Sequence, residues 1–274
     1  MNLRRVLETA GVTDVGRLRD HNEDCIGIDA DVGLAVLADG MGGYSAGEVA
    51  SGIAVATLMT GLTAALGRKQ SQRASCNACD PVGVTLLRDG IARANASILL
   101  AAAGQPQYSG MGTTLVSALF HDDRVVVGHV GDSRLYRLRD DAFEQITRDH
   151  SLLQEQIDRG LLTLEQARRS QNRNLVTRAL GIDPGVAAEI NVHNVLPGDV
   201  YMLCSDGLSD MLGEEEIRHV LVTMLDKLQL AADRLVCLAN DRGGRDNISV
   251  ILVRVLQPFP ASAGFFAKLK SWIK

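Results

Sequence analysis

Four aspartates lie at the ends of apolar, strand-like runs of this sequence. Asp39 ends LAVLAD, Asp132 ends VVVGHVGD, Asp206 ends VYMLCSD, and Asp246 directly precedes NISVILV. An isolated Asp-Gly is typical of a turn, but a turn does not require an apolar strand before each acid. Strands that end in acids at one sheet edge aim several carboxylates at one point, and such a cluster needs cations or protons to persist. Oxygen ligands without histidine or cysteine favour Mg²⁺ or Mn²⁺ over zinc, so we expect a site for hard divalent cations.

The segments around these acids divide into runs typical of strands and runs typical of helices. Short apolar or β-branched runs predict strands at 33–39, 113–120, 124–132, 133–139, 199–206 and 248–255. The three runs between residues 113 and 139 suggest an antiparallel meander. Longer runs rich in Ala and Leu predict helices at 45–66, 83–103, 214–225 and 229–240. Because strands and helices come in groups, we expect an α+β fold. Residues 149–180 are polar and helix-prone, and we interpret them as a candidate flap.

Composition and charge argue against several classes of protein. The 274 residues are 46% hydrophobic and 22% charged, which is ordinary for one large soluble domain. A net charge of −5 gives no general reason to bind nucleic acid, so we expect no nucleic-acid partner. No apolar run approaches the roughly 20 residues that span a bilayer, and the first residues lack the apolar middle of a secretory signal. We therefore expect a cytoplasmic protein.

Five cysteines are scattered through the chain and do not predict a disulfide framework. Cys76 and Cys79 form a C-x-x-C motif in a polar stretch. Such a pair can serve a redox site or half of a zinc site, but no second pair occurs to complete a zinc site. We interpret both residues as thiols of a surface loop.

Seven motifs occur in the order typical of one enzyme family. They are RDHNED at 19–24, ADGMGG at 38–43, GMGTT at 110–114, VGDSR at 130–134, DHS at 149–151, SDG at 205–207 and DN at 246–247. On these motifs the chain resembles the PP2C-like, metal-dependent (PPM) protein phosphatases of the bacterial branch, over about residues 11–256. The resemblance implies a central antiparallel β-sandwich flanked by helix pairs, with the metal site at one end. It also implies hydrolysis of phosphoserine and phosphothreonine in phosphoproteins, opposing a Hanks-type Ser/Thr kinase.

The resemblance implies a role for each acid that matches a family position. Asp39 would bridge two metals, the Gly40 carbonyl would complete the first site, and Asp206 with Asp246 would complete the second. Asp132 resembles the ligand of a third, weaker metal. Two Mn²⁺ or Mg²⁺ ions about 4 Å apart can hold a bridging water and lower its pKa from about 16 towards neutrality. Hydroxide would then attack phosphorus directly, without a covalent phosphoenzyme.

Further positions match residues that act around the metals. Glu23 and Asp24 would act through metal-bound waters, and Arg19 resembles the arginine that grips the substrate phosphate with its planar fork of donors. Eukaryotic relatives place a histidine, a proposed proton donor, where this chain has Met41. The donor stays open between a metal-bound water and His150, the latter only if the flap brings it close. We interpret His150 as structural and the remaining histidines as bystanders without cluster spacing: His21, His121, His129, His193 and His219.

The last residues form a separate region. We expect residues 1–257 to be the phosphatase domain and 258–274 to be a linker with a short basic amphipathic helix, because FFAKLKSWIK spaces its apolar residues like a helix. Packing of this helix on its own domain is the first interpretation, a partner contact the second, and contact of residues 265–274 with an anionic membrane the last.

Two other functions remain open beside an active protein phosphatase. One is a catalytically silent phosphoprotein-binding module, and the other is a hydrolase of small phosphoesters. Silent relatives of enzymes usually lose metal ligands, whereas Asp39, Asp206 and Asp246 are all present, which favours the active phosphatase. We also hypothesise that the flap gates or selects phosphoprotein substrates.

Overall fold

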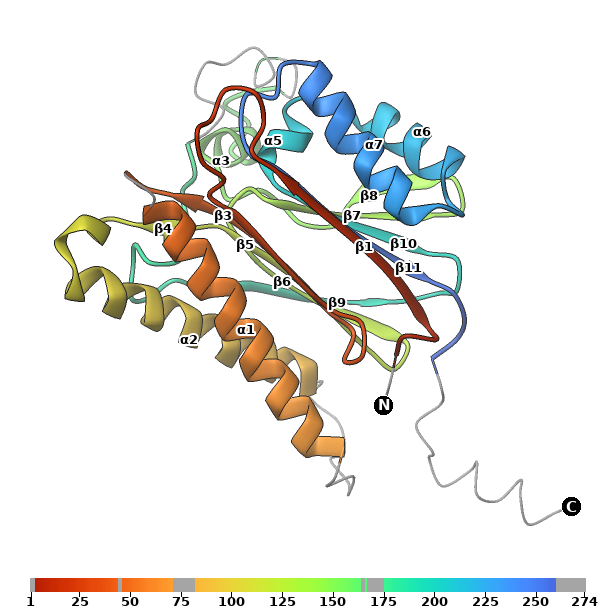
Figure 1. The fold of residues 1–274 in the computed structure, drawn as a ribbon, viewed down its shortest axis with the longest axis horizontal. Helices are drawn as coiled ribbons and strands as arrows, with labels where there is room; N and C mark the ends of the chain where they lie inside the picture. Colours follow the sequence, from red (N-terminus) through yellow and green to blue (C-terminus); the bar gives the residue numbers. More distant parts are fainter. Residues whose placement is uncertain (1–2, 44–45, 71–81, 164–165, 167–174, 260–274) are drawn as a thin grey trace, which may run out of the picture.

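The chain folds as two facing antiparallel β-sheets with helices on the outer face of each sheet (Figure 1). The structure is a computed structural model that describes residues 3–43, 46–70, 82–163, 166 and 175–259. The four layers confirm the predicted α+β sandwich flanked by helix pairs.

Each sheet is antiparallel along its whole strand order. The first sheet has the order β1 (Leu7–Asp14), β11 (Ile248–Val255), β10 (Val200–Cys204), β7 (Arg134–Arg139) and β8 (Ala142–Gln145). The second has the order β2 (Asp24–Asp29), β3 (Leu34–Met41), β5 (Leu115–His121), β6 (Arg124–Val130) and β9 (Glu189–Asn194), with β4 (Gly112–Thr113) paired to β3.

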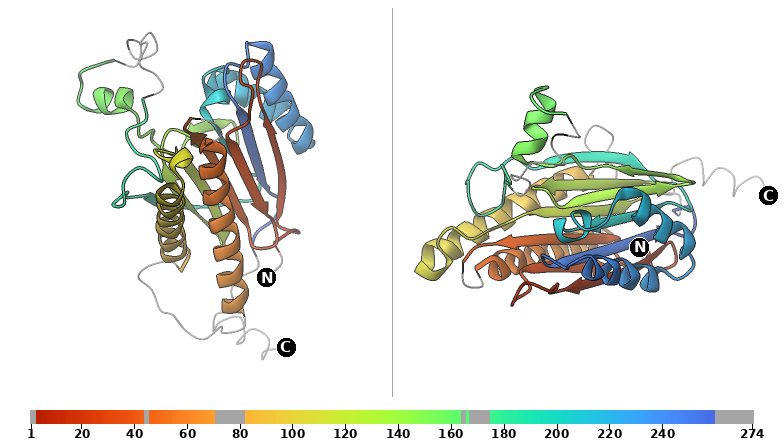
Figure 2. Two further views of the ribbon diagram at one scale, coloured as in Figure 1. Left: turned by 60° about the vertical axis from the view of Figure 1, so that its left-hand side comes forward. Right: turned by 90° about the horizontal axis from the view of Figure 1, so that it is seen from above.

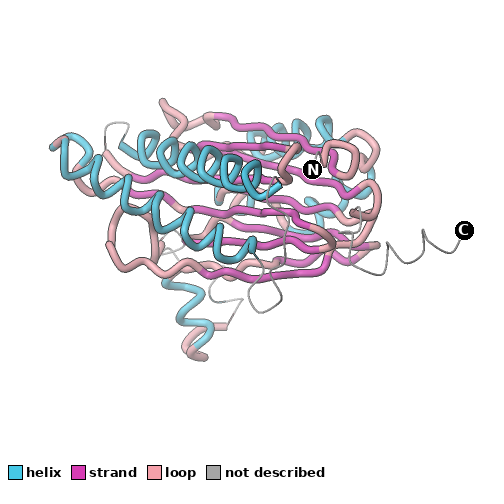
Figure 3. Tube along the Cα trace, turned by 90° about the horizontal axis from the view of Figure 1, so that it is seen from below, coloured by secondary structure: helices cyan, strands magenta, loops and turns pink. Residues whose placement is uncertain are grey.

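Two pairs of helices cover the sheets. The long helices α1 (Ala46–Gln70) and α2 (Val82–Gly104) lie side by side across the second sheet (Figure 3), and α6 (Glu214–Thr223) and α7 (Leu228–Asp241) cover the first. The shorter helices are η1 (Pro106–Tyr108), α3 (Leu152–Asp158) and α5 (Asp206–Ser209). The four long helices confirm the predicted helical segments.

The central strands of the sandwich, such as β3 and β11, are buried on both faces, which explains their nearly continuous apolar sequences. In β3, Leu34 and Val36 contact the helices, while Leu37 points between the sheets. Phe120 and Tyr201 meet there from opposite sheets, edge to face, with ring centroids 5.2 Å apart. The region between the sheets is therefore a packed core.

The expectation that no apolar run approaches the length of a membrane span is wrong for α1, which is the one described helix long and apolar enough to cross a membrane. Its buried side chains pack instead against α2 and the second sheet, and Ala50, Ala54, Leu58 and Leu62 are fully covered. The apolar composition of α1 is thus explained by its place in the core.

The three strands between residues 113 and 139 do not form one meander, so that prediction is wrong. β5 and β6 pair in the second sheet, whereas β7 pairs with β8 and β10 in the first. The chain crosses between the sheets through Gly131, Asp132 and Ser133. Gly131 has a φ of 108°, and a Cβ there would lie 2.6 Å from the Cβ of Thr114, so the crossing requires glycine. An apolar run does not specify which strand it pairs with, which is why the sequence pattern failed here.

Apart from the two-residue β4, four strands were not predicted: β1, β2, β8 and β9. They are partly exposed or short and contain Asp, Glu or Gln, so their sequences lack the apolar runs of the central strands.

Cys76, Cys79 and the amphipathic tail fall outside the described residues.

The predicted flap leaves the sandwich, and its helix α3 stands away from the sheets (Figure 2). The Ser151 hydroxyl caps α3 by accepting the Gln154 backbone N–H at 3.3 Å. The excursion closes at its root, where Ser151 bridges Val176, and it rejoins the sheet where Leu180 bridges Thr113.

Candidate metal centre

Five aspartates gather at one end of the sandwich, and they come from both sheets. Asp24 and Asp39 are opposite each other in the pairing of β2 with β3. Asp206 follows β10 and Asp246 precedes the neighbouring β11, while Asp132 lies in the crossing between the sheets. Burial and then the charges of the other four acids raise the pKa of Asp39 well above its ordinary range. The acids identified from strand ends therefore meet in space.

These acids cannot all be ionised without a compensating charge. Asp24 and Asp132 are each 8% exposed, and burial raises the pKa of both to about 6. Burial, and next the charge of Asp132, raises the pKa of Asp206 well above its usual value. Within the described part of the chain, the buried Oδ1 of Asp24 has no hydrogen-bond partner. An unpartnered carboxylate oxygen among repelling acids fits a site that holds hard divalent cations.

Backbone contacts hold Asp39 and Gly40 in place. The Asp39 N–H donates to the Thr114 hydroxyl at 3.0 Å, and the Thr114 N–H donates to the Asp39 carbonyl at 2.8 Å. The Gly40 N–H donates to the Glu23 carbonyl at 3.1 Å. A Cβ on Gly40 would lie 2.1 Å from the Gly47 carbonyl oxygen, so the close packing of these two segments requires glycine.

Two polar residues join the sheets beside the acids, and neither was predicted to have a role. The Ser205 hydroxyl, at the end of β10, donates to Asp24 Oδ2 at 2.8 Å. The Asn247 side chain accepts the Glu23 N–H at 2.8 Å and donates to two carbonyls of the preceding loop at 2.9 Å each. Their places in the SDG and DN motifs were the available signal.

Arg19 lies at the rim of the cluster. Its Nη2 donates to Asp246 Oδ2 at 2.7 Å, and its side chain is 51% exposed. The hydrogen bond to Asp246 raises the pKa of Arg19, and burial raises the pKa of Glu23 close by. A guanidinium therefore stands beside the acids and faces solvent, where a phosphate could reach both.

A model of the protein phosphatase 2C family matches residues 19–239 of the chain. The chain belongs to this family. The match begins at Arg19 and includes Asp39, Asp132 and Asp206, which are brought together by the fold.

Individual relatives of this protein phosphatase 2C chain agree. It is 38% identical over 247 residues to serine/threonine phosphatase stp of Listeria innocua, which covers 88% of this chain and 93% of the relative. The crystal structure of the Mycobacterium tuberculosis serine/threonine phosphatase PstP/Ppp superimposes with a TM-score of 0.81 at 36% identity, covering 92% of this chain and 100% of the other. The catalytic domain of PstP in complex with two manganese ions gives a TM-score of 0.78 at 35% identity, covering 92% and 99%. The chain is accordingly a serine/threonine protein phosphatase of this family.

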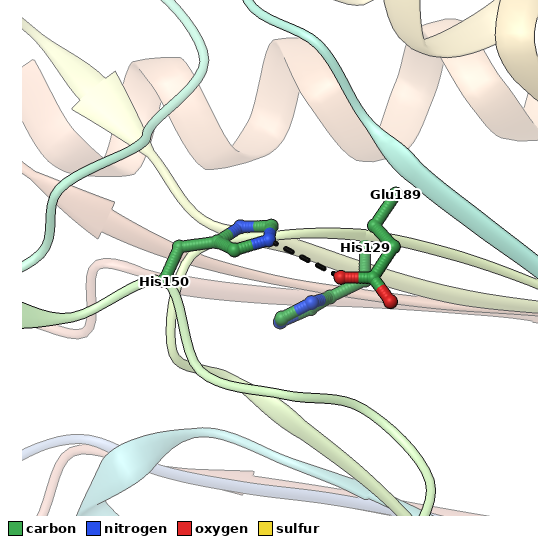
Figure 4. Close-up of side chains that lie close together, drawn as sticks. All are labelled: His129, His150 and Glu189. Carbon is green, nitrogen blue, oxygen red and sulfur yellow. Dashed lines mark ion pairs between the residues drawn. The ribbon is translucent and has the colours of Figure 1, made fainter. Parts of the chain in front are cut away.

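His129, which the sequence predicted to be a bystander, stacks on the ring of His150. The ring centroids are 4.7 Å apart, and Nε2 of His150 lies 3.5 Å from a carboxylate oxygen of Glu189 (Figure 4). The three residues come from β6, the flap root and β9. Since 21 and 39 positions separate His150 from the other two, no local spacing could have indicated this cluster.

Proposed function

We propose that this phosphatase is metal-dependent and releases phosphate from phosphoserine and phosphothreonine of other proteins. The observation that supports this most directly is the group of five aspartates with Arg19 at their rim, at the end of the sandwich where both sheets meet. The pKa shifts of the acids favour bound cations, and the exposed guanidinium favours a phosphate.

The chain would bind two Mn²⁺ or Mg²⁺ ions through Asp39, the Gly40 carbonyl, Asp206 and Asp246, and a third through Asp132 with Asp206. When bound, the cations neutralise the carboxylates and supply a water of lowered pKa as the nucleophile. Glu23 and Asp24 would orient the site through water molecules. The Ser205 hydrogen bond would keep the Asp24 carboxylate in place before substrate arrives, and the Thr114 hydrogen bond would hold the backbone of Asp39.

Arg19 would bind the phosphate and orient it towards the acids. Its Nη2 is held by Asp246, and the remaining N–H groups of its fork suit the oxygens of a phosphoryl group. Met41 has no exchangeable side-chain proton. His150 is buried under the Asp132 turn and accepts a hydrogen bond from Gly131, so we assign the leaving-group proton to solvent in the site.

The flap would help to select substrates. A cavity of about 600 Å³ lies between the flap and α5–α6, lined by Leu153 and Ile157 of α3 and by Asp210, Glu214 and Glu215 across from them. Burial, and then the charges of Asp132 and Asp210, raise the pKa of Asp206, so the cavity adjoins the proposed metal site. Protein segments on one side of the phosphorylated residue could therefore contact the flap and the metal site together.

The cellular setting is part of the same proposal. We infer that the chain acts in the cytoplasm and opposes a Ser/Thr kinase, and that residues 1–257 are the catalytic unit. The named relatives are serine/threonine phosphatases, which supports phosphoproteins as the substrate class.

Phosphate release from a phosphothreonine peptide and from p-nitrophenyl phosphate, with Mn²⁺, Mg²⁺ or EDTA, tests the proposal. Asp39→Asn should abolish Mn²⁺-dependent peptide hydrolysis while circular dichroism stays unchanged. The matched control is Asp123→Asn, whose side chain is 82% exposed and away from the acids. Peptide binding without turnover would indicate a silent binding module, and turnover of p-nitrophenyl phosphate alone would indicate a small-phosphoester hydrolase.

A further inference from the structure

His150 satisfies both backbone polar groups of Gly131, the residue before Asp132. The His150 N–H donates to the Gly131 carbonyl at 2.7 Å, and the Gly131 N–H donates to Nδ1 of the His150 ring at 3.1 Å. Gly131 has the left-handed φ of 108° that turns the chain from one sheet to the other. A buried turn needs partners for its N–H and C=O groups, and one residue supplies both here.

The hydrogen bond from Gly131 fixes the proton on the His150 ring. Because Nδ1 accepts, the neutral imidazole carries its proton on Nε2, which faces Glu189 Oε2 at 3.5 Å. Glu189 lies opposite His129 in the pairing of β9 with β6, so the sheet places the carboxylate there (Figure 4). Glu189 thus favours the tautomer that leaves Nδ1 free to accept from the turn.

His129 supports the ring from the other side. It is buried, and within the described residues neither of its ring nitrogens has a hydrogen-bond partner. Burial lowers the pKa of His129 to about 4 and also lowers the pKa of His150, so the two stacked rings are uncharged near neutral pH and do not repel.

The same three side chains also bring potential metal-ligand atoms within 4.8 Å of one another. Two imidazoles and a carboxylate are a ligand set that zinc accepts. However, a cation on Nε2 of His150 would need the lone pair that the proton occupies, while Nδ1 is already committed to Gly131. The geometry therefore favours a hydrogen-bonded cluster over a zinc site.

The backbone of His150 belongs to the root of the flap. Its carbonyl accepts the Thr177 N–H at 2.8 Å, and the next pair outward joins the Leu152 N–H to the Leu175 carbonyl at 2.9 Å. Hence one residue contacts the returning arm of the flap on one side and the Asp132 turn on the other.

We propose that His150 is a positioning residue, which holds the Gly131–Asp132 turn through its Nδ1. By holding this turn, His150 sets how tightly Asp132 binds a cation. It also connects the root of the flap to Asp132. This inference rests on the proposed function, because it takes Asp132 as a ligand of the weakest metal. Glu189 acts on the turn indirectly, through the tautomer of His150.

Two substitutions separate the hydrogen bond from the volume of the ring. His150→Phe keeps a ring to stack on His129 but removes the acceptor, which leaves the buried Gly131 N–H unpaired. His150→Asn loses ring volume but places Oδ1 where Nδ1 was, so it restores the acceptor. Removing one buried partner should weaken the lowest-affinity Mn²⁺ site about tenfold in His150→Phe and about twofold or less in His150→Asn.

Isothermal titration calorimetry of Mn²⁺ into the metal-free full chain measures these affinities, with His121→Ala, an exposed histidine, as the control. Amide hydrogen exchange at Gly131 and Asp132 gives a second readout, and it should be faster in His150→Phe than in His150→Asn. Equal losses in both variants, or none in His150→Phe, would overturn the proposal. Should His150→Phe not fold, Glu189→Leu compared with Glu189→Gln tests the same turn, and the leucine variant should have the faster exchange.

If the wild-type chain binds no Mn²⁺, the proposed function fails, while the exchange data still decide whether His150 holds the turn. If the wild type binds one zinc ion per chain that His129→Ala releases without loss of the Mn²⁺ sites, the cluster is a metal site and the positioning role is refuted.

Discussion

Asp132→Asn should stabilise the metal-free protein, although it removes a proposed metal ligand. Burial raises the pKa of Asp132 from 3.8 to about 6. The folded state therefore keeps this proton to higher pH than the unfolded state does, and the fold loses stability as pH rises from about 4 to 6. A difference of about 2.2 pKa units corresponds to about 3 kcal/mol at 1.36 kcal/mol per unit. Asparagine has nearly the same shape and carries no charge, so it should recover most of this free energy of unfolding.

Urea denaturation in EDTA measures the effect. At pH 7.5 we expect Asp132→Asn to unfold with a free energy about 3 kcal/mol higher than the wild type, and at pH 4.5 the gain should shrink to about 1 kcal/mol. The exposed Asp123→Asn serves as the control and should change stability little at either pH. A cation that binds only the folded state stabilises it, and the wild type keeps the proposed ligand Asp132. Saturating Mn²⁺ should therefore narrow or reverse the difference in free energy of unfolding between Asp132→Asn and the wild type.

A variant that is no more stable than the wild type at pH 7.5 in EDTA would refute this reasoning. It would mean that Asp132 is ionised in the folded chain without cost, and that the acids do not compete for protons. A gain of equal size at both pH values would instead point to a change in packing.

Three further predictions address residues that position the acids or the sheets. Gly40→Ala should lower the melting temperature and abolish phosphatase activity, because its Cβ would lie 2.1 Å from the Gly47 carbonyl oxygen; normal activity would show that the two segments can separate. Thr114→Val should cost about 1–3 kcal/mol in urea denaturation and reduce turnover, since the Asp39 N–H loses its partner. Arg139→Leu should cost about 3–5 kcal/mol with the proposed metal site intact, because Asp199 is 1% exposed and pairs with Arg139 through two hydrogen bonds at 2.8 and 2.7 Å. Unchanged stability in urea would mean that Asp199 is protonated or finds another partner.

The central strands and their acids could be predicted because each is specified by adjacent residues. β3 and β11 are buried on both faces over most of their length, so their sequences are mostly apolar, and the acid at the end of each apolar run lies at the end of the sandwich. The expected roles of these acids came from the family motifs, because the residues next to each acid do not indicate what it binds. Partly exposed strands such as β2 lack such a run and were not predicted.

What could not be predicted depends on contacts between distant segments. The crossing at Gly131 places β7 in the other sheet, yet the sequence of β7 is equally typical of a strand that pairs with β6 in a hairpin. His129 meets His150 only because the flap root folds back on β6. Asn247 connects β11 to the loop before β2 through its side chain, and its sequence neighbours do not indicate these partners.

The origin of the acids in two sheets makes the spacing of any bound cations depend on how the sandwich is aligned. Asp39 belongs to one sheet, and Asp206 and Asp246 flank strands of the other. If one sheet slipped past the other by a single residue, the shift would be about 3.4 Å, which is longer than the roughly 2.0–2.6 Å bonds between hard divalent cations and oxygen ligands. The side chains packed between the sheets, with Phe120 against Tyr201 among them, therefore keep the two sheets aligned and so fix the distances between the acids of one sheet and those of the other. We expect a substitution that loosens this core to weaken cation binding at the proposed metal site.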